Sequence, residues 1–156
     1  MRDIDYLLGH GLMEEDVEIE DELRIPLVRV PTLVRQEART TIMSIQQGFI
    51  CKPNDSVDVR VRKSSAMMEL RGTWVAASET TYTMTTKFRP LKQEAEMEIS
   101  EEMFNELWAA AISKQGKLRY CWNGWDIDEF DDGTVVAEYE RGEGERVTIP
   151  VCFEPK

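Results

Sequence analysis

The sequence predicts an α+β fold that is made mainly of antiparallel strands, with a few helices outside the sheet. Charged residues occupy every second position in six stretches, and residues at i, i+2 and i+4 of a strand share one face. The pairs Asn123-Gly124 and Asp132-Gly133 separate the last three of these stretches and are typical hairpin turns. Only the segment after Ser100 has a clear helical pattern. These three observations favour a sheet with one highly charged face.

The charged rows contain both signs and recur along the whole chain. They are Glu18, Glu20, Glu22 and Arg24; Asp58, Arg60 and Arg62; Lys92, Glu94, Glu96 and Glu98; Lys117 and Arg119; Asp126 and Asp128; Glu138 and Glu140. An ordinary sheet with one solvent-exposed face explains any single row. Their recurrence favours a closed barrel, which would concentrate the charge in a lumen.

The first half of the chain contains three predicted strands. Residues 1–16 are acidic and carry a Gly-His-Gly turn, so we expect an extension outside one domain formed by residues 17–156. The first strand begins near Val17 and ends near Pro31, and Pro26 confines it to an edge or a bulge. The pattern of residues 32–44 is ambiguous. Further strands are expected at residues 45–50 and 56–63, with a turn at residues 53–55 before the second.

The second half contains the helix and the remaining strands. Ser100 followed by Glu101 and Glu102 predicts the beginning of a helix, because a hydroxyl and acidic residues stabilise a helix N-terminus. Its expected apolar stripe consists of Met103, Phe104, Leu107, Trp108 and Ala111. Residues 64–80 lean apolar and are compatible with a hairpin. The other strands are expected at residues 82–88, 94–99, 117–122, 125–130 and 134–140.

Composition excludes several classes of function. The chain of 156 residues is long enough for one domain, and its net charge of −11 argues against a broad nucleic-acid-binding surface. The N-terminus lacks a signal-peptide pattern and no apolar run is long enough to span a bilayer, so we expect a cytoplasmic protein without a membrane partner. Cys51, Cys121 and Cys152 lack CxxC spacing and are expected to be free thiols. A single histidine, His10, disfavours chemistry that needs a histidine base.

Basic residues beside carboxylates suit a ligand with several phosphates and a divalent cation, since guanidinium and ammonium groups bind phosphate oxygens while carboxylates hold the metal. The motifs that carry this charge occur in a recognisable order. They are Glu20-Asp21-Glu22-Leu23-Arg24, Ile45-Gln46-Gln47-Gly48-Phe49, Pro53 to Arg62 with the arginines Arg60 and Arg62 at its end, Tyr82 to Lys87, Lys92-Gln93-Glu94-Ala95-Glu96, Lys117-Leu118-Arg119-Tyr120, Trp125 to Phe130, and Ala137-Glu138-Tyr139-Glu140.

In this order the motifs resemble the triphosphate tunnel metalloenzymes of the CYTH superfamily, and most closely the small bacterial inorganic triphosphatases. The first motif matches the family's ExExK with Arg24 in place of lysine; an alternative register begins at Glu18 and puts a glutamate at that position. The resemblance implies an eight-stranded antiparallel barrel that forms a tunnel, with helices outside. The outward apolar rows would be covered by the Ser100 helix and by a second subunit in a homodimer.

The resemblance also implies an activity: metal-dependent hydrolysis of a linear triphosphate, either inorganic tripolyphosphate or the tail of a nucleoside or thiamine triphosphate. Two alternatives stay open, a class IV adenylyl cyclase activity and a tunnel protein that binds a phosphorylated small molecule or nucleotide without turnover. Residues 64–80 look like an insertion in the family pattern. They are expected to pack over a tunnel mouth, against a partner, or on their own domain as an extended hairpin.

The same resemblance implies the roles of individual residues. Catalytic roles fall on Glu20, Glu22, Arg24 and Lys87. Phosphate binding falls on Arg60, Arg62, Lys87, Lys92, Lys117 and Arg119. Binding of Mg²⁺ or Mn²⁺ falls on Glu20, Glu22, Glu94, Glu96, Asp126, Asp128, Glu138 and Glu140.

Overall fold

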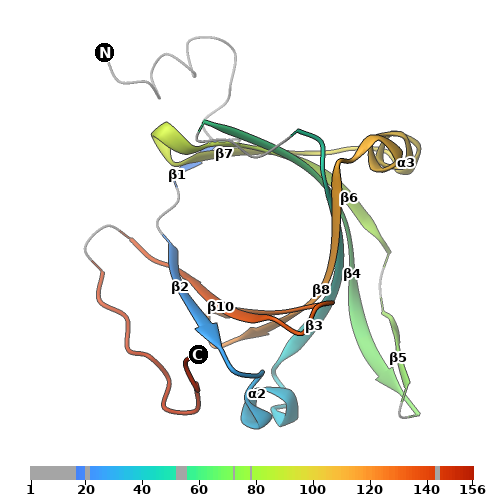
Figure 1. Cartoon of the computed structure of the whole chain (residues 1–156). Helices are drawn as coiled ribbons and strands as arrows, with labels where there is room; N and C mark the ends of the chain where they lie inside the picture. The colour runs from blue at the N-terminus through green and yellow to red at the C-terminus, as the bar shows by residue number, and fades with distance from the viewer. Residues whose placement is uncertain (1–16, 20–21, 52–55, 72, 78, 143–144) are drawn as a thin grey trace. The chain divides into compact units, whose positions relative to one another are not determined.

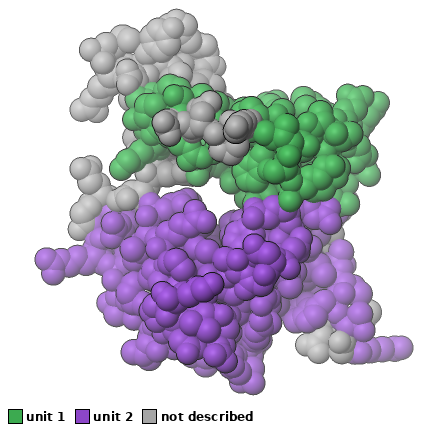
Figure 2. All heavy atoms as spheres, in the orientation of Figure 1, with its two compact units in different colours: residues 1–20, 47–63, 81–114 green, residues 21–46, 64–80, 115–156 purple. Residues whose placement is uncertain are grey.

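The computed structural model describes residues 17–19, 22–51, 56–71, 73–77, 79–142 and 145–156 (Figure 1). The chain divides into two compact units (Figure 2). Unit 1 comprises residues 1–20, 47–63 and 81–114, and unit 2 comprises residues 21–46, 64–80 and 115–156. The expected N-terminal extension, Glu20 and the expected turn at residues 53–55 lie outside the described residues.

Unit 1 is a small antiparallel sheet with one helix. Its sheet follows the order β1, β7, β6 and the first half of β4, and β7 pairs antiparallel with both β1 and β6. The elements are β1 (Val17–Ile19), β4 (Val57–Leu70, shared with unit 2), β6 (Thr81–Phe88), the short 3₁₀ helix η2 (Arg89–Leu91), β7 (Gln93–Glu98) and α3 (Glu101–Ala110).

Unit 2 contains the remaining strands, in the order β3, β8, β9, β10 and β2, with the β4–β5 hairpin beside them. The elements are β2 (Glu22–Leu27), α2 (Thr32–Gln36), β3 (Thr41–Phe49, whose end belongs to unit 1), β5 (Thr73–Ala76), β8 (Ser113–Trp122, whose start belongs to unit 1), β9 (Trp125–Phe130) and β10 (Val135–Glu140). An antiparallel sheet with few helices confirms the α+β class. The strand pairings of the described residues do not close the sheet, so the eight-stranded barrel stays a prediction.

Two segments that the sequence pattern left open have a clear structure. Residues 32–44 contain the short helix α2 and the beginning of β3, which is longer than the strand expected at residues 45–50. Residues 64–80 form a hairpin in which the end of β4 pairs with β5, for example Met67 with Ala76. Met67 packs against the hydrophobic core of unit 2. The hairpin therefore packs on its own unit, which is the expected alternative of an extended hairpin packed on its own domain.

The turns between the last strands follow the sequence prediction. Asn123 and Gly124 both have positive φ, 48° and 81°, and the flanking Trp122 and Trp125 are paired across the hairpin. Positive φ at both central residues is the geometry that favours Asn-Gly in two-residue hairpins. In the next turn the side chain of Asp132 accepts a hydrogen bond of 2.8 Å from the backbone N–H of Thr134. Local sequence thus determines both connections.

The helix α3 begins as expected but buries a narrower face. The Ser100 hydroxyl accepts a hydrogen bond of 3.1 Å from the backbone N–H of Met103. Phe104 is buried and packs on Tyr82 of β6, with ring centroids 5.2 Å apart. Met103 is exposed, contrary to the predicted stripe. Consecutive helical residues differ by about 100°, and the helix packs through the side that carries Phe104 and Trp108, the latter close to Gly48 of β3.

The core of unit 2 lies on the face of its sheet that carries the apolar residues. It includes Leu27, Val34, Trp125, Ile127 and Phe153, and the Phe153 and Trp125 rings meet edge-on at 4.9 Å. Residue 28 donates a backbone hydrogen bond of 2.9 Å to residue 154, so the C-terminal segment runs along β2. Because β2 ends the strand order of the sheet, the prediction that the Pro26 segment is an edge is confirmed.

The three cysteines are free, as predicted. Among the described residues, no helix combines the length and the apolar character that a membrane crossing requires.

Candidate functional site

The strand register of unit 2 places the predicted charged residues on one face of four adjacent strands. Residues that are directly opposite in an antiparallel pair share a face. Across β2, β10, β9 and β8 these residues are Glu22, Arg24, Glu138, Glu140, Asp126, Asp128, Lys117 and Arg119. The residues between them, such as Leu23, Ala137, Ile127 and Leu118, belong to or pack against the core. The alternation read from the sequence is therefore real, and it separates a charged face from an apolar one.

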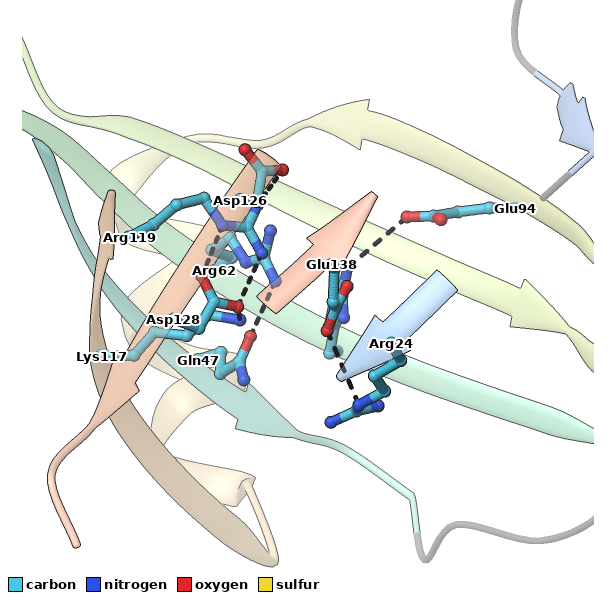
Figure 3. A network of polar contacts seen from close by, with 10 residues as sticks. Arg24, Gln47, Arg62, Glu94, Lys117, Arg119, Asp126, Asp128 and Glu138 are labelled. Atoms are coloured by element: carbon cyan, nitrogen blue, oxygen red, sulfur yellow. Dashed lines mark hydrogen bonds and ion pairs between the residues drawn. The ribbon is translucent and has the colours of Figure 1, made fainter. Parts of the chain in front are cut away.

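Asp128 is the centre of this charged face (Figure 3). It is fully buried and accepts hydrogen bonds from Lys117 Nζ at 2.7 Å and from Arg119 Nε and Nη2 at 2.8 and 3.0 Å. Burial by itself raises the pKa of Asp128, but the hydrogen bonds and charges of Arg119 and Lys117 outweigh it and hold this pKa below its ordinary value. Asp128 is thus an ionised carboxylate that orients two cations.

Arg119 belongs to a second contact on the same face. Its Nη1 lies 3.8 Å from Asp126 Oδ2, in addition to its bonds with Asp128. Burial by itself lowers the pKa of Arg119, whereas the bonds and charges of Asp128, with Asp126 and Glu138, raise it above its ordinary value. The guanidinium therefore stays charged. Its planar set of N–H donors can bind a second anion in addition to Asp128.

Two pairs of carboxylates lie directly opposite each other in unit 2. Glu22 of β2 is opposite Glu140 of β10, and Glu138 of β10 is opposite Asp126 of β9. Arg24 is also opposite Glu138, and its Nε lies 3.9 Å from Glu138 Oε1. Glu22 and Arg24 thus share the charged face, which is compatible with both readings of the ExExK motif, because each reading places its residues at every second position. Glu20, its first member, lies outside the described residues.

Unit 1 carries a second group of the predicted residues. Lys87 of β6 is opposite Glu94 of β7, and Arg60 Nη2 lies 3.5 Å from Glu94 Oε1. The Thr85 hydroxyl donates a hydrogen bond of 3.2 Å to Glu96. Arg62 Nη2 donates a hydrogen bond of 2.8 Å to Gln47 Oε1. Basic and acidic side chains therefore alternate over neighbouring strands here as well.

A small cavity of about 30 Å³ lies among these strands, and Phe49, Asp58, Arg60, Thr85 and Lys87 line it. Asp58 forms an ion pair with Arg89 through Oδ2, while its Oδ1 is buried without a hydrogen-bond partner. A space of this volume holds one water molecule or one phosphate oxygen. Sequence reasoning gave no role to Asp58, although its position two residues before Arg60 was a usable signal.

Lys92 departs from the predicted row. The strand β7 begins at Gln93, and Lys92 ends η2 with a left-handed φ of 50°. Strand alternation therefore does not place Lys92 on the face of Glu94. The 3₁₀ turn after Pro90 breaks the row, because the extended conformation that alternation requires begins only one residue later.

A divalent cation fits the donor set of unit 2. Within the described part of the chain, no three His, Cys, Asp or Glu side chains form a ready-made metal centre. Arginines lie near two of the opposed carboxylates: Arg24 is 3.9 Å from Glu138 and Arg119 is 3.8 Å from Asp126. The pairs Glu22–Glu140 and Asp126–Glu138 offer carboxylate oxygens, which Mg²⁺ and Mn²⁺ prefer. Asp128 fits less well, since both of its oxygens already bind Lys117 and Arg119.

Comparisons with known proteins bear on the fold. No family model and no curated protein matches the chain. Two solved structures are similar, each with 22% sequence identity. One, of the hypothetical protein NE1496, has a TM-score of 0.54 and covers 87% of this chain and 87% of its own. The other, of the inorganic triphosphatase NE1496, has a TM-score of 0.53 and covers 86% of this chain and 83% of its own. The chain therefore has a fold similar to that of an inorganic triphosphatase, in agreement with the resemblance to the triphosphate tunnel metalloenzymes.

Proposed function

We propose that this protein hydrolyses a linear triphosphate in a reaction that depends on Mg²⁺ or Mn²⁺. The observation that carries the proposal is the charged face of unit 2, where cations and opposed carboxylates alternate in register over four strands. The similarity of fold to an inorganic triphosphatase supports it. The closed barrel and its tunnel, which the family resemblance implies, belong to the same proposal.

Unit 2 would hold both the cation and part of the phosphate chain. Glu22, Glu140, Asp126 and Glu138 would bind the metal through their carboxylates, and the metal would supply charge neutralisation and polarise a water molecule. Arg119 would bind phosphate oxygens with the part of its guanidinium that Asp128 does not use. Asp128 would keep Lys117 and Arg119 in place before a ligand arrives, which lowers the cost of binding.

Unit 1 offers a separate place for a phosphate oxygen. The cavity beside Arg60 and Lys87 has room for one such atom, and these two cations would bind it, while Arg89 pairs with the Asp58 carboxylate on the same wall. Phosphoryl transfer depends mainly on positioning and charge neutralisation, so a site without histidine is no obstacle. In this scheme the carboxylates orient the attacking water, and Arg24 binds phosphate oxygens through its planar guanidinium.

The proposal is tested by a phosphate-release screen over tripolyphosphate, pyrophosphate, nucleoside triphosphates and thiamine triphosphate, with Mg²⁺, with Mn²⁺ and with a chelator. We expect release from at least one triphosphate, and we expect the chelator to abolish it. Formation of cyclic AMP and pyrophosphate from ATP would instead indicate a cyclase. Saturable binding of triphosphates by calorimetry without any turnover would indicate a binding protein and contradict the proposal.

A substitution of Arg24 is predicted to change KM and kcat differently. Its side chain is 61% exposed and meets Glu138 at 3.9 Å, so it has the freedom to contact a ligand. We expect Arg24→Lys to raise KM by about three- to tenfold, the effect of losing one charge-assisted hydrogen bond, while kcat is kept or increased. Steady-state kinetics with tripolyphosphate measures both constants.

Arg29 offers the matched control for Arg24. It is exposed to a similar degree, lies beyond the end of β2 and pairs with Glu154 at 3.2 Å. Arg29→Lys should leave both constants unchanged. If Arg24→Ala has the kinetics of the wild type, Arg24 does not contact the ligand and the chosen ExExK register has to be given up.

A further inference from the structure

Unit 2 contains a second pocket that the proposed activity does not use. It has a volume of about 280 Å³ and is lined by Arg35, Ile42, Met67, Trp74, Leu118 and Tyr120. The residues come from α2, β3, β8 and the β4–β5 hairpin, so segments far apart in the sequence build its wall. The hairpin of residues 64–80, which the family pattern does not account for, contributes Met67 and Trp74.

The pocket lies on the opposite face of β8 from the phosphate-binding candidates. Lys117 and Arg119 point to the charged face, where both contact Asp128. Leu118 and Tyr120 alternate with them and therefore point to the other face. A ligand in this pocket is separated from Asp128 by the strand itself, so the pocket is a distinct site whose occupation does not depend on the proposed hydrolysis.

Hydrogen bonds hold the polar rim of the pocket in one geometry. Arg35 Nη1 donates to the Tyr120 hydroxyl at 2.9 Å, and Arg35 Nη2 donates to Glu129 Oε2 at 2.8 Å. The Tyr120 hydroxyl in turn donates to Glu129 Oε1 at 3.3 Å. Burial and the charge of Glu129 raise the pKa of Tyr120, so the phenol stays protonated at neutral pH. Because Glu129 balances the charge of Arg35, the rim favours a neutral polar group over an anion.

The lining determines the chemical class of the ligand. The Trp74 ring is half exposed and offers a flat aromatic surface, while Ile42, Leu118 and Met67 supply aliphatic and thioether contacts. The Arg35 guanidinium has five N–H groups, of which the bonds to Tyr120 and Glu129 use two. We propose that this pocket binds a neutral, flat heteroaromatic molecule of about two fused rings, stacked on Trp74, with a hydrogen-bond acceptor on its edge that Arg35 recognises.

The test uses quinoline as the probe, because it has two fused rings and one acceptor nitrogen and is neutral at pH 7. In protein labelled with ¹⁵N, the indole N–H signal of Trp74 should shift in a saturable manner as quinoline is added. The signal of Trp108, which belongs to unit 1, should not move. Naphthalene has the same shape without the nitrogen, and it should bind about three- to tenfold more weakly.

Two variants make the result specific. Trp74→Ala should weaken quinoline binding by about three- to tenfold in calorimetric titration, because stacking is lost at a half-exposed position that the fold tolerates. Leu33→Ala removes another exposed apolar side chain of unit 2 that does not line the pocket, and it should bind as the wild type does. No saturable shift of Trp74 in the wild type, or equal losses in both variants, would overturn the proposal.

Discussion

Glu22→Gln and Glu140→Gln are each expected to lower metal-dependent phosphate release at least about 100-fold, which corresponds to about 3 kcal/mol of lost transition-state stabilisation. The two carboxylates lie directly opposite each other on β2 and β10. Replacing one of them by an amide of nearly the same shape removes a charge that the divalent cation needs. The volume of the side chain and its place in the sheet do not change. The assay is steady-state release of phosphate with Mg²⁺ or Mn²⁺.

A thermal measurement separates loss of the metal from loss of the fold. Each substitution keeps nearly the same shape at its strand position, so neither should lower the melting temperature of metal-free protein by more than about 2 °C. Added metal should raise the melting temperature of the wild type and have a smaller effect on the variants, since a ligand stabilises only the state that binds it.

Glu106→Gln, an exposed change on α3, serves as the control and should behave as the wild type in both assays. Wild-type turnover in both variants would refute the assigned metal ligands.

Asp128→Asn is expected to destabilise the fold by about 3–5 kcal/mol, because it leaves the buried Lys117 and the partly buried Arg119 without their counter-charge. Lys117 is 6% exposed at its side chain, and Arg119 donates two of its bonds to this carboxylate. The asparagine side chain has nearly the same shape, but it is uncharged and has one acceptor oxygen, whereas the carboxylate has two. Urea unfolding at pH 7 measures the change in free energy.

The same residue predicts a dependence on pH. The pKa of Asp128 is lower in the folded protein than in the unfolded chain, so the unfolded state binds the extra proton first as the pH falls. The stabilisation is therefore present above about pH 4 and is lost as the pH falls further, through the folded pKa. In Asp128→Asn this part of the acid sensitivity should disappear, and the stability of the variant should depend less on pH below 4.

Asp126→Asn is the control for the Asp128 substitution. Asp126 is on the same strand but is 44% exposed, and its contact with Arg119 is 3.8 Å long. Exposed ion pairs are worth little, so the change should cost less than about 1 kcal/mol. Equal destabilisation by the two substitutions would show that the buried geometry of Asp128 has no special role.

The local parts of the fold could be predicted from the sequence. Strand alternation has a period of two, so the charged and apolar faces of β8, β9 and β10 follow directly from residues 117–140. The Asn123-Gly124 turn and the Ser100 cap depend on neighbouring residues alone, and both have the expected geometry. The hairpin of residues 64–80 and the helix α2 were harder to predict, because tertiary packing of Met67 and Val34 decides them.

The sequence predicted which residues form the candidate site, but not which of their side chains contact one another. Within the strands the sequence alone determined which side chains share a face, because local backbone geometry fixes that; Lys92, which precedes β7, departs from its predicted row. Only the tertiary structure decided which of them meet: Glu22 faces Glu140, while Asp128, expected to bind metal, is bonded to Lys117 and Arg119. It also decided that Trp74 and Tyr120 line one pocket. The physical reason is that strand register and burial depend on contacts between residues far apart in the chain, which no local pattern encodes.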